Sequence, residues 1–206
     1  MLKFNFTLLN IGTNHSSKSK IVDIKLKSKF DSYWIKKINE FQGNVADNED
    51  HNKLRVYKTF KACFAREPYL TLIRNRNQRS SLTRLRISAH TLATEIGRRI
   101  RPKVPFNLRL CEFCSNSVPN QTTDKAFIDT ELHFLVVCDR FKHTREKLFN
   151  QVDEILPGFK NMGDTGKFLT LLCPTNPKLV KVVSRCIEDM FIKRQDIKDG
   201  GVAASP

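Results

Sequence analysis

Three cysteines and one histidine gather within residues 111–138. Cys111, Cys114, His133 and Cys138 have the spacing C-x2-C-x18-H-x4-C. Thiolate and imidazole are the ligands that Zn²⁺ takes in tetrahedral sites, and a CxxC turn holds two sulfurs close enough to bind one ion. The four residues therefore predict a shared zinc ion. Because protein side chains would fill all four positions and leave none for water or substrate, the expected role of the ion is structural.

The last two ligands place a condition on the local backbone. His133 and Cys138 lie in TELHFLVVC, which has the pattern of a helix. Positions five apart on an ideal helix point about 140° apart, so the two side chains would not converge on one ion. We therefore predict that the helix ends or loosens before Cys138. Asp139 is a good N-cap for a helix that follows.

Other interpretations of these residues remain open at this point. His133 and Cys138 could simply pack in a core beside Phe134 and Leu135, although four ligands in order favour the metal. His143 is a competing fourth ligand, but its polar surroundings fit a solvated helix face better.

The other cysteines, Cys63, Cys173 and Cys186, are expected to be buried thiols, because buried cysteine behaves as a small hydrophobe. Six cysteines in 206 residues are too sparse for a secreted disulfide framework. The N-terminus lacks the long apolar segment of a signal peptide, and no apolar run reaches ~18 residues. We therefore expect reduced thiols, an intracellular location, nuclear or cytoplasmic, and no membrane association.

Motifs of catalysis are not found. Glu131 stands two residues before His133, but the HExxH arrangement of a metalloprotease is absent. Paired carboxylates, a Gly-rich phosphate loop and a nucleophile elbow are also missing from the sequence. We therefore predict that the chain is not an enzyme.

Positive charge is concentrated in one segment. Residues 51–110, named here the basic segment, contain fifteen Lys or Arg and only two acids, Glu67 and Glu95, and so carry +13 of the net +15. Such a field suits a polyanion such as nucleic acid, and arginine suits bidentate contact with phosphate. The candidate nucleic-acid-binding residues are Arg74, Arg76, Arg79, Arg84, Arg86, Arg98, Arg99 and Arg101.

Two features of these arginines bear on the interpretation. Cations before a helix oppose its dipole, so an anionic partner would relieve the arginines that surround the start of the helix expected at 81–96. Arg98 and Arg99 follow the end of that helix, where cations are favoured without any partner. A merely solvated surface is the alternative to nucleic-acid binding.

Apolar periodicity predicts the elements that position these residues. Helices are expected over 21–41, from 53, over 81–96, from 139 to 156 and from 177 to 195, and strand alternation is rare. Ser80 or Ser81 would cap the third helix and Gly97 would end it. We predict a mainly α, small irregular helical domain built around the zinc site. Its expected parts are an irregular 1–20, a helical basic 21–110, a zinc motif 111–145, C-terminal helices 146–198 and a flexible tail 199–206.

Two groups of residues resemble the C-terminal region of non-LTR (LINE-type) retrotransposon reverse transcriptases. The first has the pattern L-x-x-L-R-x-x-x-H-x-L-x-x-E-x-G-R, and the second is C-x-x-C followed by E-x-H-F-L-x-x-C-x-x-F-x-x-x-R. They are carried by Leu82, Leu85, Arg86, His90, Leu92, Glu95, Gly97 and Arg98, then by Cys111, Cys114, Glu131, His133, Phe134, Leu135, Cys138, Phe141 and Arg145.

The resemblance covers roughly residues 50–195. It implies a zinc-binding CCHC region that helps to hold template RNA or target DNA. The chain lacks the family's Tyr-x-Asp-Asp polymerase motif and its endonuclease half, so it looks like the detached tail of such an element. In the helix that resembles the family, His90 is expected to pack or to hydrogen-bond rather than to ligate, because Ala89 and Leu92 are its neighbours.

Two functions follow from this reading. The first is a non-catalytic, zinc-stabilised nucleic-acid-binding module, with contacts to shape and backbone rather than to sequence. The second is a zinc-stabilised helical adapter for a protein partner, which an exposed apolar stripe on the last helix would favour.

Overall fold

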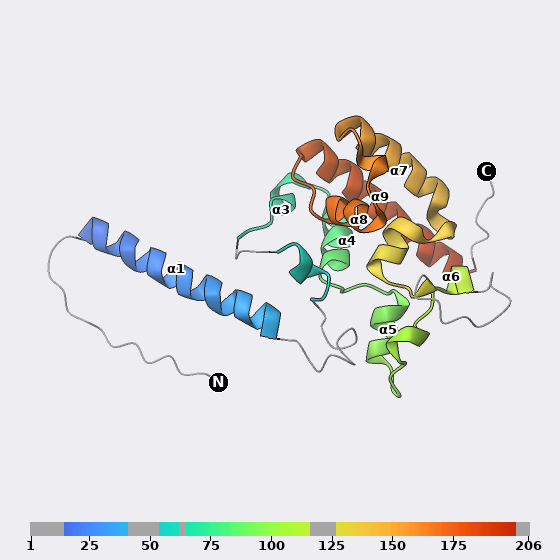
Figure 1. The fold of residues 1–206 in the computed structure, drawn as a ribbon, viewed down its shortest axis with the longest axis horizontal. Helices are drawn as coiled ribbons and strands as arrows, with labels where there is room; N and C mark the ends of the chain where they lie inside the picture. The colour runs from blue at the N-terminus through green and yellow to red at the C-terminus, as the bar shows by residue number, and fades with distance from the viewer. Residues whose placement is uncertain (1–14, 41–53, 62–64, 116–126, 201–206) are drawn as a thin grey trace.

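A computed structural model of the chain describes residues 15–40, 54–61, 65–115 and 127–200, and these form a mainly helical domain (Figure 1). The α-helices are α1 (His15–Glu40), α3 (Tyr69–Leu72), α4 (Arg76–Arg86), α5 (Ala93–Arg99), α6 (Glu112–Ser115), α7 (Lys142–Ile155), α8 (Asp164–Leu172) and α9 (Pro177–Lys198). The 3₁₀ turns are η1 (Tyr57–Thr59), η2 (Phe106–Leu108), η5 (Asp139–Phe141) and η6 (Phe159–Asn161), and η4 (His133–Val137) is a π-helical turn.

The predicted mainly α fold is confirmed. The described part of the chain has no β-strand, and its one isolated bridge pairs Leu110 with Ile128. Of the helices in that part, none is both long enough and apolar enough to cross a bilayer. Cys63 and most of the two expected terminal segments lie outside the described residues.

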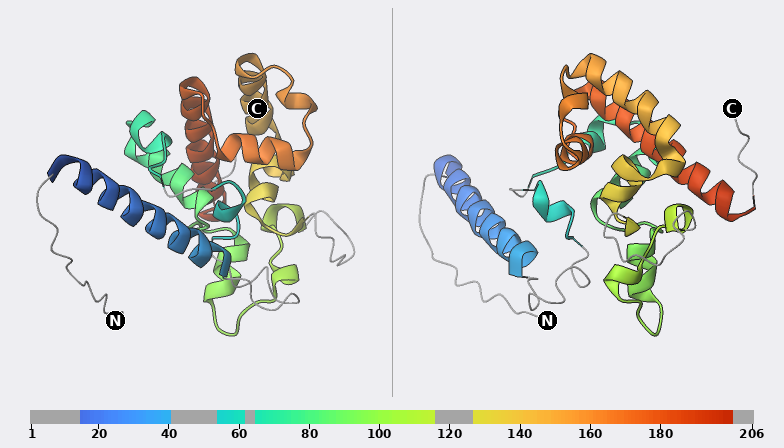
Figure 2. Two further views of the ribbon diagram at one scale, coloured as in Figure 1. Left: turned by 60° about the vertical axis from the view of Figure 1, so that its left-hand side comes forward. Right: turned by 45° about the vertical axis from the view of Figure 1, so that its right-hand side comes forward.

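Helix α9 is the centre of the core, and α4 and α7 both pack against it (Figure 2). Its start is fixed by Asn176, whose side chain accepts a hydrogen bond from the Lys178 N–H, and by Pro177 in the first turn. Val183, Ile187 and Met190 are fully buried. Each such side chain contributes roughly 1.5–3 kcal/mol by leaving water. Most of the apolar stripe of α9 is thus used within the domain, and Val182 and Phe191 are its partly buried members.

The single helix predicted over 81–96 is two helices, and this corrects the sequence-based expectation. Helix α4 begins after Asn75, whose side chain accepts hydrogen bonds from the N–H groups of Asn77 and Gln78, so the cap is not Ser80 or Ser81. The helical path then breaks at 87–92, where Ser88 has a φ of +50°. The break turns Ser88 and His90 inward to the buried carboxylate of Glu131.

Gly97 lies within α5 rather than at a helix end, and Arg109 explains it. A Cβ at Gly97 would lie 2.8 Å from the Arg109 Nε and 2.9 Å from its Cδ. That guanidinium is held in place by hydrogen bonds to the carbonyl oxygens of Val104 (2.7 and 2.9 Å) and Thr94 (2.8 Å). The glycine therefore allows the connection at 100–108 to fold back against α5.

Gly97→Ala is expected to lower the free energy of unfolding by about 1–3 kcal/mol, because the new methyl group displaces a fully bonded Arg109. The control is Gly166→Ala in α8, where a Cβ would meet Met162 at 3.4 Å, an ordinary contact. That variant should be neutral or up to ~1 kcal/mol more stable, since alanine favours helix over glycine. Urea unfolding of both variants measures the difference, and equal stabilities would contradict this account of Gly97.

Helix α1 stands to one side of the other helices in every view (Figures 1 and 2). It begins at His15, six residues before the start predicted from periodicity. Ile24, Leu26, Phe30 and Tyr33 are exposed on it. Near its end, Trp34 meets Tyr57 edge to face, with ring centroids 6.3 Å apart.

Candidate metal centre

The four predicted ligands come together in one buried cluster, named here the metal cluster. The sulfurs of Cys111, Cys114 and Cys138 and a ring nitrogen of His133 all lie within 4.8 Å of one another. The Cys114 Sγ lies 3.5 Å from the His133 Nε2 and 3.6 Å from the Cys138 Sγ, which lies 3.8 Å from the Cys111 Sγ. The four ligand atoms thus surround a point at which a single ion could be held.

A π-helical turn brings His133 and Cys138 to the same side of their segment. The Cys138 N–H donates to the His133 carbonyl at 2.7 Å, which is the i→i+5 bond of a π turn. The wider turn removes the divergence that an α-helix would impose on residues five apart. The predicted loosening is therefore present. Asp139, in contrast, makes no side-chain cap, because the 3₁₀ turn η5 separates it from α7.

The CxxC turn is fixed by pairing with the chain just before the π turn. The Cys111 N–H donates to the Phe127 carbonyl at 2.8 Å, and the Asp129 N–H donates to the Arg109 carbonyl at 2.9 Å. The Cys114 N–H closes the turn on the Cys111 carbonyl at 3.2 Å. Two segments separated by residues 116–126 are thus joined at the cluster.

The three thiols are electrostatically coupled. The hydrogen bond with Cys138 outweighs burial and lowers the pKa of Cys111, and the same bond, together with burial, raises the pKa of Cys138. Burial also raises the pKa of Cys114. A bound cation would take the place of the protons held between the sulfurs, since cysteine binds metal as the thiolate. Metal affinity should therefore fall as the pH falls.

Glu131 links the metal cluster to the basic segment. Its Oε1 accepts hydrogen bonds from Arg55 (2.7 Å), Ser88 (2.5 Å) and His90 (2.9 Å). Burial alone would raise the pKa of Glu131, but the His90 hydrogen bond and the Arg55 charge outweigh it and lower the pKa to about 2. Arg55 also bonds Glu95 at 2.7 Å. His90 therefore has the hydrogen-bonding role expected of it.

A second buried ion pair ties α9 to the same region. The Arg194 guanidinium lies 2.6 Å from the Asp129 Oδ2, which also accepts from the Ala93 N–H at 2.6 Å. Burial raises the pKa of Asp129 to about 6, although the Arg194 charge acts against it. Arg194 also lies over the Phe113 ring in the CxxC turn, 5.0 Å from its centroid. The Arg194–Asp129 ion pair thus joins the end of α9 to the start of α5 and to the CxxC turn.

Arg145 supports the π turn from α7. Its guanidinium donates to the carbonyl of Cys138 at 2.8 Å, which also accepts from the Phe141 N–H at 3.1 Å, and to the carbonyl of Val137 at 3.3 Å. Phe134 lies between Phe141 and Phe191, with ring centroids 5.2 and 4.8 Å away. These contacts fix the orientation of the chain that carries two of the ligands.

The remaining cysteines and histidine lie elsewhere. His143 is exposed on α7 and does not belong to the cluster. Cys186 is buried, and burial raises its pKa to about 12, whereas Cys173 is only half-buried. The described cysteines are all free thiols.

Arg86 was predicted to bind nucleic acid, but the structure buries it. It is 3% exposed and pairs with Glu67 at 2.6 Å, while its guanidinium lies between the rings of Phe60 and Tyr69 at 4.3 and 4.8 Å from their centroids. It also donates to the Leu172 carbonyl. Arg86 therefore holds the core together and is not open to a ligand.

The other predicted arginines divide into two groups. Arg79 is half-buried and donates to the Ile73 carbonyl at 2.9 Å, and Arg98 pairs with Glu95 at 2.6 Å. The arginines of the second group are exposed to solvent and are named here the exposed arginines: Arg74, Arg76, Arg84, Arg99 and Arg101. Among the described residues, Arg99 approaches Glu95 only to 3.8 Å, and no ion pair is formed by the other four.

Comparison with known proteins gives no relative. No protein-family model matches the chain, and neither does any curated protein or solved structure.

The prediction from sequence counted Arg55, Arg86 and Arg109 with the surface charge, but Arg86 and Arg109 are buried and Arg55 is half-buried. One signal was present for Arg86: it stands four residues after Leu82, on the face of α4 that is buried. No comparable signal marks Arg55, because its carboxylate partners are 40 and 76 residues away, or Arg109, because its partners are backbone carbonyls, which every residue offers.

Proposed function

We propose that the metal cluster binds one zinc ion. Bond lengths of about 2.3 Å to sulfur and 2.0–2.1 Å to nitrogen place tetrahedral ligand atoms about 3.8 Å apart for two sulfurs and about 3.6 Å for sulfur and nitrogen. Three of the six separations are 3.6 and 3.8 Å between sulfurs and 3.5 Å between sulfur and nitrogen, and all six lie within 4.8 Å. With four protein ligands the ion would be structural. Reduced thiols of this kind suit an intracellular protein, nuclear or cytoplasmic.

We propose further that the chain is a non-catalytic nucleic-acid-binding module stabilised by this ion. The observation that carries the proposal is that both acids of the basic segment already form ion pairs within the chain. Glu67 is paired with Lys61 and Arg86, and Glu95 with Arg55 and Arg98. With these acids engaged elsewhere, Arg74, Arg76, Arg84 and Arg101 remain available to the phosphates of a nucleic acid.

The resemblance to the tail of LINE-type reverse transcriptases supports the same function. Glu131, His90 and Arg145, which belong to the resembling patterns, all stabilise the region of the metal cluster. Zinc would thus fix the π turn, and through Glu131 it would fix Arg55 and the turn between α4 and α5. The exposed arginines on both helices would then be presented on a rigid support.

Titration of the zinc-loaded protein with RNA, single-stranded DNA and duplex DNA tests the function. We expect binding whose affinity falls steeply between low and moderate salt, because phosphate contacts release counterions. Arg74→Gln/Arg76→Gln/Arg84→Gln should reduce the slope of log K against log salt by about 2–3. The matched control is Lys25→Gln/Lys27→Gln/Lys29→Gln on α1, which should change the slope less. Binding that is indifferent to salt would contradict the proposal.

A protein-interaction adapter is the second candidate, and one apolar patch favours it. Ile96 and Ile100 at α5 and Leu108 after it are 39%, 45% and 52% exposed, and they line one groove. An exposed apolar patch of this kind can mark a protein-binding surface. If the protein binds none of the three nucleic acids, this patch is where a partner would be sought.

A further inference from the structure

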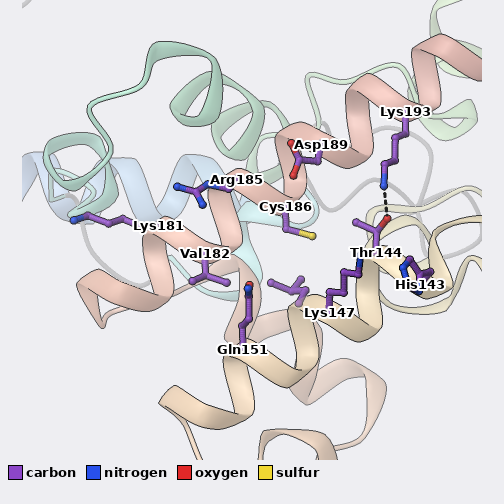
Figure 3. Close-up of a pocket in the computed structure, with 11 residues that line it drawn as sticks. His143, Thr144, Lys147, Gln151, Lys181, Val182, Arg185, Cys186, Asp189 and Lys193 are labelled. Carbon is purple, nitrogen blue, oxygen red and sulfur yellow. Dashed lines mark hydrogen bonds between the residues drawn. The ribbon is translucent and has the colours of Figure 1, made fainter. Parts of the chain in front are cut away.

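A groove of about 350 Å³ runs between α7 and α9, on elements outside the basic segment. Figure 3 shows its side chains entering from the two helices, with the Lys193 ammonium donating to the Thr144 hydroxyl at 2.8 Å. Leu148, Val182 and Cys186 form an apolar floor. The groove is not part of the metal centre and contains none of the predicted binding residues.

Four cations line this groove and one acid accompanies them. Lys147 comes from α7, and Lys181, Arg185 and Lys193 come from α9, while Asp189 is the acid. Within the described residues, none of the four cations forms an ion pair. Lysines and arginines at ordinary surfaces are usually interspersed with carboxylates. Four cations and one acid leave the groove with a net charge of +3, which concentrates positive potential between the low-dielectric walls of the two helices.

The length of the row decides which anion it fits. Lys181 and Lys193 are twelve residues apart on one helix, which corresponds to about 18 Å at 1.5 Å per residue. A single phosphate could contact only one end of such a row. A polynucleotide strand carries a charge about every 3.4 Å along a duplex axis, so several consecutive phosphates would lie along the groove.

We propose that the groove between α7 and α9 binds consecutive phosphates of a polynucleotide, as a second contact surface besides the exposed arginines. This inference rests on the proposed nucleic-acid-binding function and extends it to the C-terminal helices. The apolar floor receives the methylene stems of the lysines and leaves their ammonium groups to the ligand. Thr144 holds the Lys193 ammonium at one end of the row.

The test compares a groove variant, Lys147→Gln/Lys181→Gln/Arg185→Gln, with the wild type, with Arg74→Gln/Arg76→Gln/Arg84→Gln and with the α1 control Lys25→Gln/Lys27→Gln/Lys29→Gln. All three variants lose the same charge. Fluorescence anisotropy with labelled single-stranded RNA, single-stranded DNA and duplex DNA gives Kd at several salt concentrations. Circular dichroism checks that each variant is folded.

We expect the groove variant to bind at least about tenfold more weakly at low salt than the wild type, with a salt slope reduced by about 2–3. The α1 control should change Kd by less than about threefold. A groove variant that binds like the wild type, or no more weakly than the α1 control, overturns the groove proposal while leaving the proposed function standing. A wild-type protein that binds no nucleic acid contradicts the function itself, and with it the groove.

A separate arm distinguishes the polymer from free phosphate. Inorganic phosphate is added to the wild type while the amide signals of α7 and α9 are followed by NMR. We expect shifts only at millimolar phosphate, and larger shifts with the oligonucleotide at micromolar concentration. Saturation by micromolar inorganic phosphate would identify a small-anion site and contradict the polynucleotide assignment.

Discussion

Cys111→Ser/Cys114→Ser is expected to abolish the binding of one equivalent of zinc and to unfold the chain locally after Arg101. Two of the four ligands are lost, and the CxxC turn that joins residues 109–114 to 127–129 loses the ion that closes it. Structural zinc contributes directly to folding, so a loss of at least ~5 kcal/mol corresponds to a fall in Tm of about 10–20 °C for a chain of this size. Metal analysis and thermal unfolding measure the two effects.

Cys173→Ser provides the matched control, because Cys173 is a half-buried free thiol outside the cluster. It should keep its zinc and nearly all of its stability. If the double variant fails to accumulate, chelation of zinc from the wild type serves instead. Hydrogen exchange should then speed up at the amides of Cys111, Asp129 and Cys138. Full zinc content in the double variant would disprove the ligand assignment.

Glu131→Gln is expected to lower the free energy of unfolding at pH 7 by about 3 kcal/mol, because it leaves Arg55 and His90 without the buried charge that pairs with them. Exposed Glu146 on α7 provides the control, and Glu146→Gln should be nearly neutral. Both variants should keep the zinc ligands intact. If Glu131→Gln were as stable as the control, the contacts of Glu131 with Arg55 and His90 would not hold the basic segment in place.

The pH dependence of stability follows from the same carboxylate. The pKa of Glu131 is lowered from 4.5 to about 2 in the folded chain, so the group stabilises the fold above pH ~4.5. That contribution, at most about 3 kcal/mol, is lost as the pH falls from ~4.5 to ~2. The difference in unfolding free energy between the wild type and Glu131→Gln should therefore shrink over this range. Both proteins lose their metal in acid, so the difference between their unfolding free energies cancels that contribution.

The sequence was sufficient to predict that Cys111, Cys114, His133 and Cys138 come together, and to predict the condition on their backbone. Cysteine spacing is short-range information, and the angle between His133 and Cys138 follows from helix geometry alone. The apolar face of α9 could be predicted for the same reason, because its apolar residues recur at helical spacing within one helix.

The break between α4 and α5 could not be predicted in this way. Leu82, Leu85 and Leu92 fit one helical period, and nothing local shows that Ser88 and His90 bond a glutamate more than forty residues later. The buried arginines share this cause, because their partners come from other segments. The groove cations were also invisible, since Lys147 and the α9 cations lie on different helices and are brought together only by the packing of α7 on α9.

X-ray absorption at the zinc edge of the purified protein would show which atoms bind the ion. We expect one zinc per chain, with three sulfurs at about 2.3 Å and one nitrogen at about 2.0–2.1 Å, and no exchangeable oxygen ligand. A chain that holds no zinc in stoichiometric amount, or whose zinc is bound by fewer than three sulfurs with oxygen completing the shell, would contradict this expectation.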